Sequence, residues 1–228
     1  RARGPVRSRD EASVLEELRR LSDAGYKEVV LTAISLPSYG TDSGTSLVEL
    51  IEKAAEVPGI ERIRLGSLDP DMLHDEDILR MAGVKKLCPQ FHLSLQSGCD
   101  KTLRAMRRPY TTAQYADIAA KLREAFGAEK VSFTTDVIVG FPGETEEDFE
   151  ASMTFVTGMQ FLKVHVFPYS RREGTAAYDF PGQVPEHEKE SRSRRMTAAV
   201  EEVRAAEVAA MQGRTASVLL ETPLSNTL

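Results

Sequence analysis

Residues 134–145 read TTDVIVGFPGET, and the fold of the chain can be read outward from this stretch. The apolar run over residues 131–139 predicts a strand buried on both faces, and Gly140 to Gly143 predict a tight turn after it. Thr145 can cap a helix that has acidic residues in its first turn. A buried strand, a Gly/Pro turn and a capped helix in this order are typical of the ligand-facing edge of an α/β sheet.

Asp136 is the one charged residue within this strand. A carboxylate is costly to bury unless another group pairs with it. We therefore expect Asp136 either to accept hydrogen bonds from a ligand or to bridge to a neighbouring element of the fold.

Five segments predict strands that alternate with helices along the chain. They are residues 28–32, 62–65, 91–95, 131–139 and 162–167. Strands that alternate with helices form a parallel sheet with right-handed crossovers, and the carboxyl ends of parallel strands meet at one edge. Proteins of the α/β class bind their ligands at that edge. These residues alone therefore predict an open or partial α/β barrel that binds a small polar ligand.

The composition is that of an ordinary globular protein. The 228 residues carry a net charge of −6, which argues against a surface that clamps nucleic acid over its whole extent but not against a local basic groove. No apolar run reaches the roughly 18 residues that a membrane span needs, and the cytoplasm is the expected location. Cys88 and Cys99, the only cysteines, have neither disulfide nor zinc spacing, and we interpret both as structural.

Polar residues after the third predicted strand are candidates for ligand contacts. Gln96 and Ser97 can each hydrogen-bond a ribose-like hydroxyl, although the pair could equally be a turn that closes the strand. An arginine of the run Arg104, Arg107 and Arg108 could reach back to a carboxylate with two parallel hydrogen bonds, or the run could be solvated surface.

Two histidines lie within predicted strands. His92 in the third strand and His165 in the fifth strand alternate with apolar neighbours. A lone strand histidine is more often a satisfied core residue than a ligand, so each is either a core residue or a polar group that faces inward.

Several long segments together resemble one family. They are residues 1–9 (RARGPVRSR), 26–40 (YKEVVLTAISLPSYG), 96–98 (QSG), 106–111 (MRRPYT), 134–145 and 165–175 (HVFPYSRREGT). In this order, over nearly the whole chain, they are similar to the radical S-adenosylmethionine (radical SAM) methylthiotransferases. The first and last segments look most like the branch that methylthiolates N6-threonylcarbamoyladenosine beside the tRNA anticodon. The branches that act on isopentenyladenosine and on ribosomal protein S12 are less similar there.

The resemblance implies a partial (β/α)6 barrel with parallel strands over residues 1–212, whose first strand is missing. Residues 213–228, which include a predicted strand over 215–221, would begin a truncated C-terminal RNA-binding β-barrel of the TRAM type. The implied cofactors are S-adenosylmethionine (SAM) and two 4Fe–4S clusters. One cluster cleaves SAM to a 5′-deoxyadenosyl radical that abstracts hydrogen from adenine C2, and the other, in a separate N-terminal domain, delivers the sulfur.

The implied partners are tRNA, bound through its anticodon loop, and a sulfur donor. No membrane is involved, and a monomer is compatible with the family.

The resemblance also assigns residues to the site. Thr32 and Ala33 match the place where the family meets the methionine amino group of SAM, although the family usually has glycine where Ala33 stands. The other positions that match cofactor contacts are Ser67, Gln96, Ser97 and Asp136 for ribose and methionine, Arg108 for the methionine carboxylate, and Ile138 and Phe167 for the adenine face. The residues expected to contact the substrate are Tyr39, Tyr169 and Arg171.

The resemblance also sets limits on this chain. The family's three cluster cysteines, spaced Cys-x3-Cys-x2-Cys, would precede Arg1, and no residue of the chain can replace their thiolates. We therefore expect these 228 residues to bind SAM weakly and to be inactive by themselves.

Two other interpretations stay open. A barrel lyase or aldolase would use Asp136 with Lys163 as acid and base. A non-catalytic RNA-binding fragment would use the basic residues 1–9 with Arg192, Arg194 and Arg195.

Overall fold

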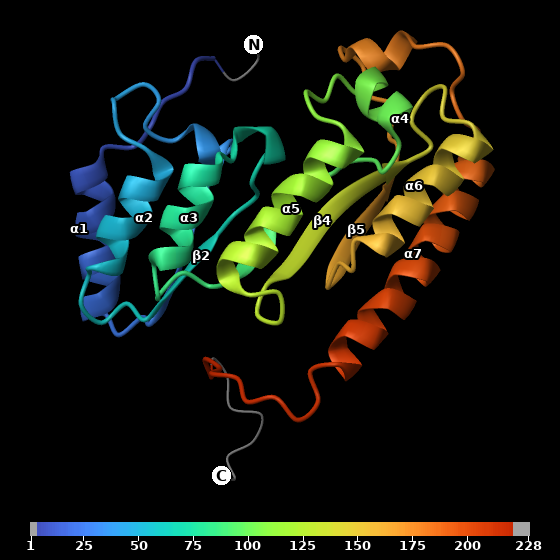
Figure 1. Ribbon diagram of the computed structural model, residues 1–228. Coiled ribbons are helices and arrows are strands. Elements are labelled where there is room, and N and C mark those ends of the chain that lie inside the picture. The colour runs from blue at the N-terminus through green and yellow to red at the C-terminus, as the bar shows by residue number, and fades with distance from the viewer. Residues whose placement is uncertain (1–3, 221–228) are drawn as a thin grey trace.

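The computed structural model describes residues 4–220, in which strands and helices alternate as the sequence predicts (Figure 1). The strands are β1 (Glu28–Leu31), β2 (Arg62–Leu65), β3 (Gln90–His92), β4 (Ser132–Val139) and β5 (Lys163–Pro168). The helices are α1 (Glu11–Asp23), α2 (Leu47–Ala55), α3 (Asp75–Gly83), α4 (Asp100–Ala105), α5 (Thr112–Phe126), α6 (Glu146–Gly158) and α7 (Glu186–Ala209). Short 3-10 turns are η1 (Leu36–Ser38), η2 (Pro70–Met72) and η3 (Ala176–Asp179).

The strands pair in parallel, as expected. β1 pairs with β2, and β4 lies between β3 and β5. The ladder is interrupted between β2 and β3, where single parallel bridges join Ile63 to Leu87 and Leu68 to Leu93. The described strands therefore curve into a sheet that does not close, and the predicted partial barrel is confirmed.

Helices cover only one face of this sheet. Along β4 the alternate residues Phe133, Thr135, Val137 and Val139 are buried against the helices, within the core that they share with α5 and α6. The residues between them, including Asp136, are only half-buried. The expectation that β4 is buried on both faces is therefore wrong, because no layer among the described residues covers the concave side.

The side chains on the concave face, most of which are polar, form a surface that is called the inner wall below. Strand register and burial place on it Glu28 of β1, Arg62 and Arg64 of β2, Gln90 and His92 of β3, Thr134 and Asp136 of β4, and Lys163, His165 and Phe167 of β5. Side chains of paired residues in a parallel ladder point to the same face, so these groups share one surface.

The capped helix starts agree with the sequence. The Asp10 side chain accepts a hydrogen bond from Ser13 N at the start of α1. Thr145 forms a capping box with Asp148 at the start of α6, where each side chain bonds the backbone amide of the other residue. The capping box thereby fixes the end of the turn between β4 and α6 at which the helix begins.

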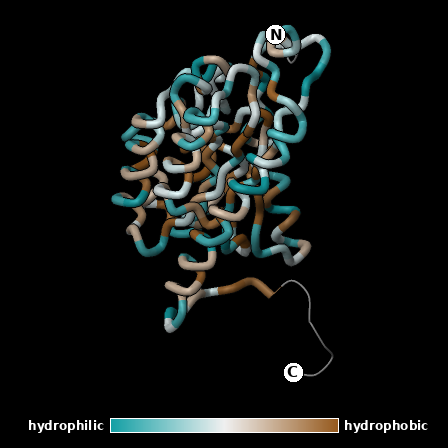
Figure 2. The backbone as a smooth tube through the Cα atoms, turned by 90° about the vertical axis from the view of Figure 1, so that its right-hand side faces the viewer, coloured by the Kyte–Doolittle hydropathy of each residue, from teal (hydrophilic) through white to brown (hydrophobic). Residues whose placement is uncertain are grey.

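The chain after α7 extends past the sheet and contacts it twice, where Arg214 Nη1 donates to Glu129 O (2.9 Å) and Arg62 Nη1 donates to Ser217 O (3.0 Å). α7 itself packs against β5 and α6, with Met196 and Val200 buried. The strand expected over residues 215–221 does not form over the described part of that range, and residues 221–228 of the expected RNA-binding barrel lie outside the described residues. Val218 and Leu220 are exposed, and Figure 2 shows this apolar stretch in brown beyond the body. None of the helices within residues 4–220 is long and apolar enough to cross a membrane.

The other margin of the sheet has a free edge. Among the described residues β1 pairs with β2 alone. A hollow of about 840 Å³ lies beside it, lined by α1, by β1 and by residues 4–9. Its apolar lining includes Val14, Leu18 and Val29. The unpaired edge of β1 therefore faces an apolar hollow.

Candidate cofactor site

β3 ends in a bulge that sets the position of Gln96. Leu93 N donates to Thr134 O (3.0 Å), and the next bond of the ladder is Gln96 N to Asp136 O (2.9 Å). A regular parallel ladder would use residue 95 at that place, so β3 carries one extra residue. Gln96 has φ +71°, a backbone conformation that is uncommon for any residue except glycine. Such conformations cluster at functional sites, where the surrounding structure enforces them.

Buried hydroxyl groups hold the bulge in place. The Thr135 hydroxyl donates to Leu93 O (2.5 Å) and accepts from Leu95 N (3.0 Å). The Tyr115 hydroxyl also donates to Leu93 O (3.0 Å). The Tyr110 hydroxyl donates to the carbonyl of Leu95 (3.1 Å) and to that of the preceding residue (2.8 Å). Burial raises the pKa of Tyr110 to about 12 and also raises the pKa of Tyr115, so both remain protonated donors at neutral pH.

The turn after β4 depends on a buried ion pair. Gly140 has φ +72°, and a Cβ atom there would lie 2.3 Å from Lys189 Cγ, so only glycine fits. Gly140 N donates to Glu144 Oε1 (2.8 Å), and Arg192 Nη1 of α7 donates to the same oxygen (2.9 Å). The two side chains of this pair are 2% and 5% exposed. Burial raises the pKa of the Glu144 carboxyl, while the Gly140 amide and the Arg192 guanidinium oppose that shift.

Asp136 faces His92 on the neighbouring strand without a hydrogen bond between them, so the bridge expected of it is not formed and the ligand alternative stays a prediction. Its Oδ2 lies 3.5 Å from His92 Nε2, and His92 Nδ1 is 3.0 Å from the Thr134 hydroxyl. His165 is the register partner of Asp136 on β5, and its ring stacks on that of Phe167 with centroids 6.5 Å apart. Both strand histidines are thus inner-wall residues rather than core residues.

The structure brings together most of the residues predicted to contact the cofactor. Gln96 and Asp136 lie on adjacent strands, and Ile138 is the register partner of Phe167, whose ring is 49% exposed. The exposed residues that follow β1 and β2 at the same edge of the sheet are Thr32, Ala33 and Ser67. Arg108 is half-buried and lies two residues before Tyr110, whose hydroxyl donates to Leu95 O after β3.

Ser97 does not lie with this group. Its side chain is fully buried, and its hydroxyl accepts a hydrogen bond from Cys99 N (3.2 Å). The sequence predicted an accessible hydroxyl, but the chain turns inward after Gln96 to start α4.

Two of the predicted substrate contacts, Tyr39 and Arg171, are hydrogen-bonded within the chain, whereas the buried hydroxyl of Tyr169 has no partner among the described residues. The Tyr39 hydroxyl donates to Arg9 O (3.0 Å). Tyr169 packs edge-to-face on Phe141 with ring centroids 5.2 Å apart. Arg171 Nε donates to the carbonyl of residue 178 (2.7 Å). Their roles toward a substrate stay predictions.

Comparison with known proteins identifies the family. A model of the radical SAM superfamily matches residues 1–156. The chain belongs to the radical SAM superfamily. Its structure is similar to that of the radical SAM enzyme coproporphyrinogen III oxidase (HemN) of Escherichia coli, with a TM-score of 0.61 and 14% identity over 85% of this chain and 46% of that chain. This likeness shows the fold.

Curated relatives of this radical SAM chain are methylthiotransferases, and the predicted resemblance is confirmed. The tRNA-2-methylthio-N(6)-dimethylallyladenosine synthase of Caldicellulosiruptor saccharolyticus is 39% identical over 96% of this chain and 46% of the relative. The threonylcarbamoyladenosine tRNA methylthiotransferase MtaB of Chlamydia pneumoniae is 38% identical over 96% of this chain and 51% of the relative. The chain spans about half the length of both, and their similar identities do not separate the two nucleosides.

Membership of the radical SAM superfamily implies SAM and a 4Fe–4S cluster as cofactors. Cysteine thiolates hold such clusters, and the chain has only Cys88, which is buried, and Cys99, which is half-buried. Within residues 4–220 no group of three or more His, Cys, Asp and Glu side chains could hold a metal ion. The residues of this chain therefore do not fit the cluster. They do fit SAM, because an exposed aromatic ring, an aliphatic side chain and polar groups converge at the edge of the sheet.

The hydroxyl of Thr135 can be tested by substitution. Thr135→Val keeps the shape of the side chain and leaves Leu95 N without its hydrogen-bond partner. We expect the free energy of unfolding in urea to fall by about 1–3 kcal/mol. The exposed Thr154 of α6 gives a matched control, because Thr154→Val should change stability by less than about 0.5 kcal/mol. Equal effects of the two substitutions would contradict a role of the hydroxyl in the bulge.

The ion pair behind the turn gives a second prediction. Glu144→Gln removes the carboxylate charge beside Arg192, which keeps its hydrogen bond to the backbone carbonyl of residue 144 (3.1 Å) and longer contacts to Glu146 (3.5 Å) and Glu188 (3.7 Å). We expect a loss of roughly 3 kcal/mol in the free energy of unfolding, as for other broken buried pairs. The surface pair of Glu52 with Arg80 (2.7 Å) is the control, since Glu52→Gln should cost at most about 1 kcal/mol. If both variants lose the same stability, the turn does not depend on the pair.

Proposed function

We propose that this chain is the SAM-binding core of a radical methylthiotransferase that modifies C2 of N6-threonylcarbamoyladenosine beside the anticodon of tRNA. The observation that carries the proposal is the convergence of Gln96, Asp136, Ile138 and Phe167 at the carboxyl ends of β3, β4 and β5. The curated relatives support the reaction class and tRNA as the substrate.

The residues of the site have separate tasks in this proposal. Ile138 and Phe167 provide an apolar surface for the adenine ring of SAM, and the exposed Phe167 ring can stack on it. Gln96, held by the bulge, and Asp136 hydrogen-bond the ribose and methionine parts. Arg108 pairs with the methionine carboxylate.

Other groups complete the arrangement. Thr32 and Ala33 meet the methionine amino group at the end of β1. SAM, when bound, supplies the 5′-deoxyadenosyl radical, and the protein orients its reactive carbon against the target base. The thiolates for two 4Fe–4S clusters, the sulfur donor and the remainder of the RNA-binding surface would come from outside this chain. We therefore propose that residues 1–228 alone do not cleave SAM.

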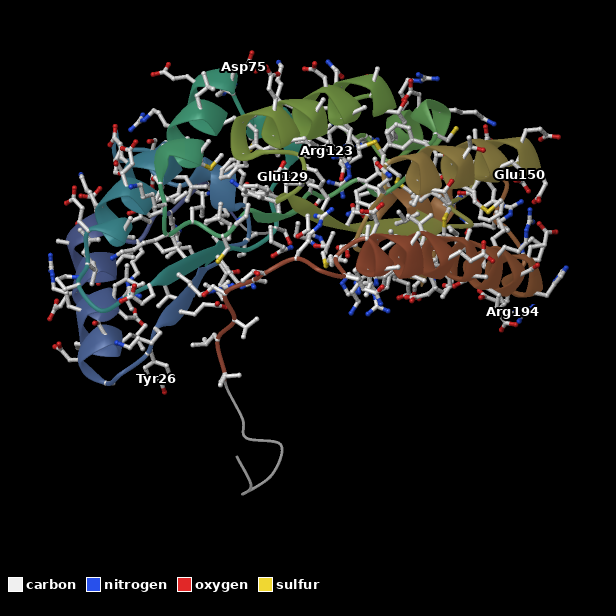
Figure 3. All side chains as sticks on the ribbon, turned by 60° about the horizontal axis from the view of Figure 1, so that its bottom comes forward. Tyr26, Asp75, Arg123, Glu129, Glu150 and Arg194 are labelled. Atoms are coloured by element: carbon white, nitrogen blue, oxygen red, sulfur yellow. The ribbon has the colours of Figure 1, made fainter. Side chains whose placement is uncertain are left out.

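The alternatives have less support. A methylthiotransferase for isopentenyladenosine or for ribosomal protein S12 would use the same site with another substrate. A non-catalytic RNA-binding fragment would need the arginines of α7, but Arg192 pairs with Glu144 and Arg195 with Glu146. Of the three arginines, Arg194 has only a 4.0 Å contact to the exposed Glu190, and Figure 3 shows it at the surface. A lyase that uses Lys163 finds no support among the relatives.

SAM binding by the intact, cluster-loaded protein tests the site. We expect Phe167→Ala to weaken binding about tenfold, because the adenine ring loses a stacking surface. Equilibrium dialysis with labelled SAM measures the affinity without turnover. Tyr26, an exposed aromatic residue outside the predicted SAM site that is labelled in Figure 3, gives the control variant Tyr26→Ala, which should bind normally. Unchanged binding by Phe167→Ala would remove the proposed adenine site.

The reaction itself is tested by product analysis. The intact protein is incubated under anaerobic conditions with SAM, a reductant and tRNA that carries N6-threonylcarbamoyladenosine, and the nucleosides are separated by mass spectrometry. We expect the 2-methylthio derivative of that nucleoside. A methylthio group found only on dimethylallyladenosine, when that tRNA is supplied, would correct the substrate but keep the reaction. No product with either tRNA would contradict the proposed function.

A further inference from the structure

The inner wall carries one connected set of polar side chains that crosses the sheet. Glu28 on β1 pairs with Arg62 (2.7 Å) and with Arg64 (2.8 Å) on β2. Arg64 Nη1 donates to the Gln90 amide oxygen on β3 (3.1 Å), and so joins the two halves of the sheet where the backbone ladder is interrupted. The Gln90 amide nitrogen lies 3.3 Å from the hydroxyl of Thr134 on β4. The polar groups of four strands are therefore held in fixed positions relative to one another.

The charge of the inner wall is opposite in sign to that of the whole chain. One carboxylate, Glu28, holds two guanidinium groups, which leaves one positive charge in excess. Lys163 on β5 is exposed and makes no ion pair within residues 4–220. Asp136 is the one further carboxylate on the wall. With neutral histidines the wall carries one net positive charge, in a chain whose net charge is −6.

Some polar groups of the inner wall lack a hydrogen-bond partner among the described residues. Lys163 is the register partner of Thr134, whose hydroxyl contacts His92 Nδ1 at 3.0 Å. The other nitrogen of His92 has no hydrogen-bond partner among the described residues, and Asp136 Oδ2 lies 3.5 Å away. The Asp136 side chain is 33% exposed, so its oxygens can accept from a ligand. Lys163 and Asp136 therefore lie at successive inner-wall positions of β5 and β4.

This pattern matches one of the two N6 substituents named among the relatives and mismatches the other. A threonylcarbamoyl group carries a carboxylate, together with N–H and O–H donors. A dimethylallyl group is a hydrocarbon without any of them. A hydrocarbon against Lys163 would desolvate its ammonium group without giving it a partner, and sites built for polar contacts reject such analogues strongly.

Resting on the proposed function, we propose that Lys163 selects a target adenosine whose N6 substituent carries a carboxylate. The Lys163 ammonium group pairs with that carboxylate, while Asp136 keeps its contact with SAM. Lys163 is a specificity-determining residue, and the chemical step does not use it. The open side of the curved sheet gives the substituent access to the wall.

Four RNA hairpins that differ only in the N6 group of one adenosine test the proposal. The groups are none, threonylcarbamoyl, the methyl ester of threonylcarbamoyl, and dimethylallyl. The ester keeps the shape of the substituent and removes its charge. Binding to the intact, cluster-loaded protein is measured by fluorescence anisotropy at one fixed salt concentration. We expect the threonylcarbamoyl hairpin to bind about tenfold more tightly than the ester, the difference of one well-placed charge pair.

Variants assign that difference to one side chain. Lys163→Gln should bind the threonylcarbamoyl hairpin and the ester equally, and Lys163→Arg should restore part of the difference. Lys85, exposed in the loop between α3 and β3, gives the control variant Lys85→Gln, which should retain the full difference. Equal binding of acid and ester by the unsubstituted protein, or an equal loss for all hairpins in Lys163→Gln, would overturn the assignment.

Two further outcomes separate this inference from the function on which it rests. The methionine carboxylate of SAM is another carboxylate that Lys163 could bind. A fall in SAM affinity in Lys163→Gln, with the hairpin differences kept, would assign the residue to SAM and overturn the inference alone. If none of the four hairpins binds better than an unrelated hairpin, the proposed function fails and the inference fails with it.

Discussion

The carbonyl of Leu93 and the amide and carbonyl of Leu95 take no part in the ladder between β3 and β4 and are buried, so other groups must hydrogen-bond them. Three hydroxyl side chains from β4, from α5 and from the loop before α5 meet this requirement. Without them, these buried backbone groups of the bulge that presents Gln96 would have no partners. The geometry of the candidate cofactor site therefore depends on polar residues that a ligand need not touch.

Local sequence patterns predicted the strands, the helix starts and the parallel sheet, because periodicity and caps act over a few residues. The two buried faces expected for β4 were wrong, since the pattern of one strand does not say whether both sides of the sheet are covered. In β2, by contrast, Arg62-Ile63-Arg64-Leu65 alternates polar and apolar residues. This alternation, which the prediction did not use, agrees with a strand that has one polar, uncovered face. The pair of Glu144 with Arg192 was missed, because its two residues lie 48 positions apart and no local signal connects them.

Candidate site residues divide in the same way. Asp136 was identified because a charge in an apolar strand is costly, and Phe167 and Ile138 entered through the resemblance to a family. The link between His92 and Asp136 depends on the register between two strands, which the sequence of neither strand contains. Ser97 was expected at the surface because it follows a strand, but the bulge and the start of α4 turn its hydroxyl inward. Register and bulges are tertiary properties, so only coordinates could place these side chains.

The free edge of β1 has a consequence for the behaviour of these residues in solution. It presents unpaired backbone amides and carbonyls beside an apolar hollow, with Val30 also exposed on the concave side. Such an edge is a template for strands from other molecules, and neither a proline nor a bulge within β1 blunts it. The β1 edge of one copy of residues 1–228 could then pair with a strand of another copy, and such self-association would rise with concentration.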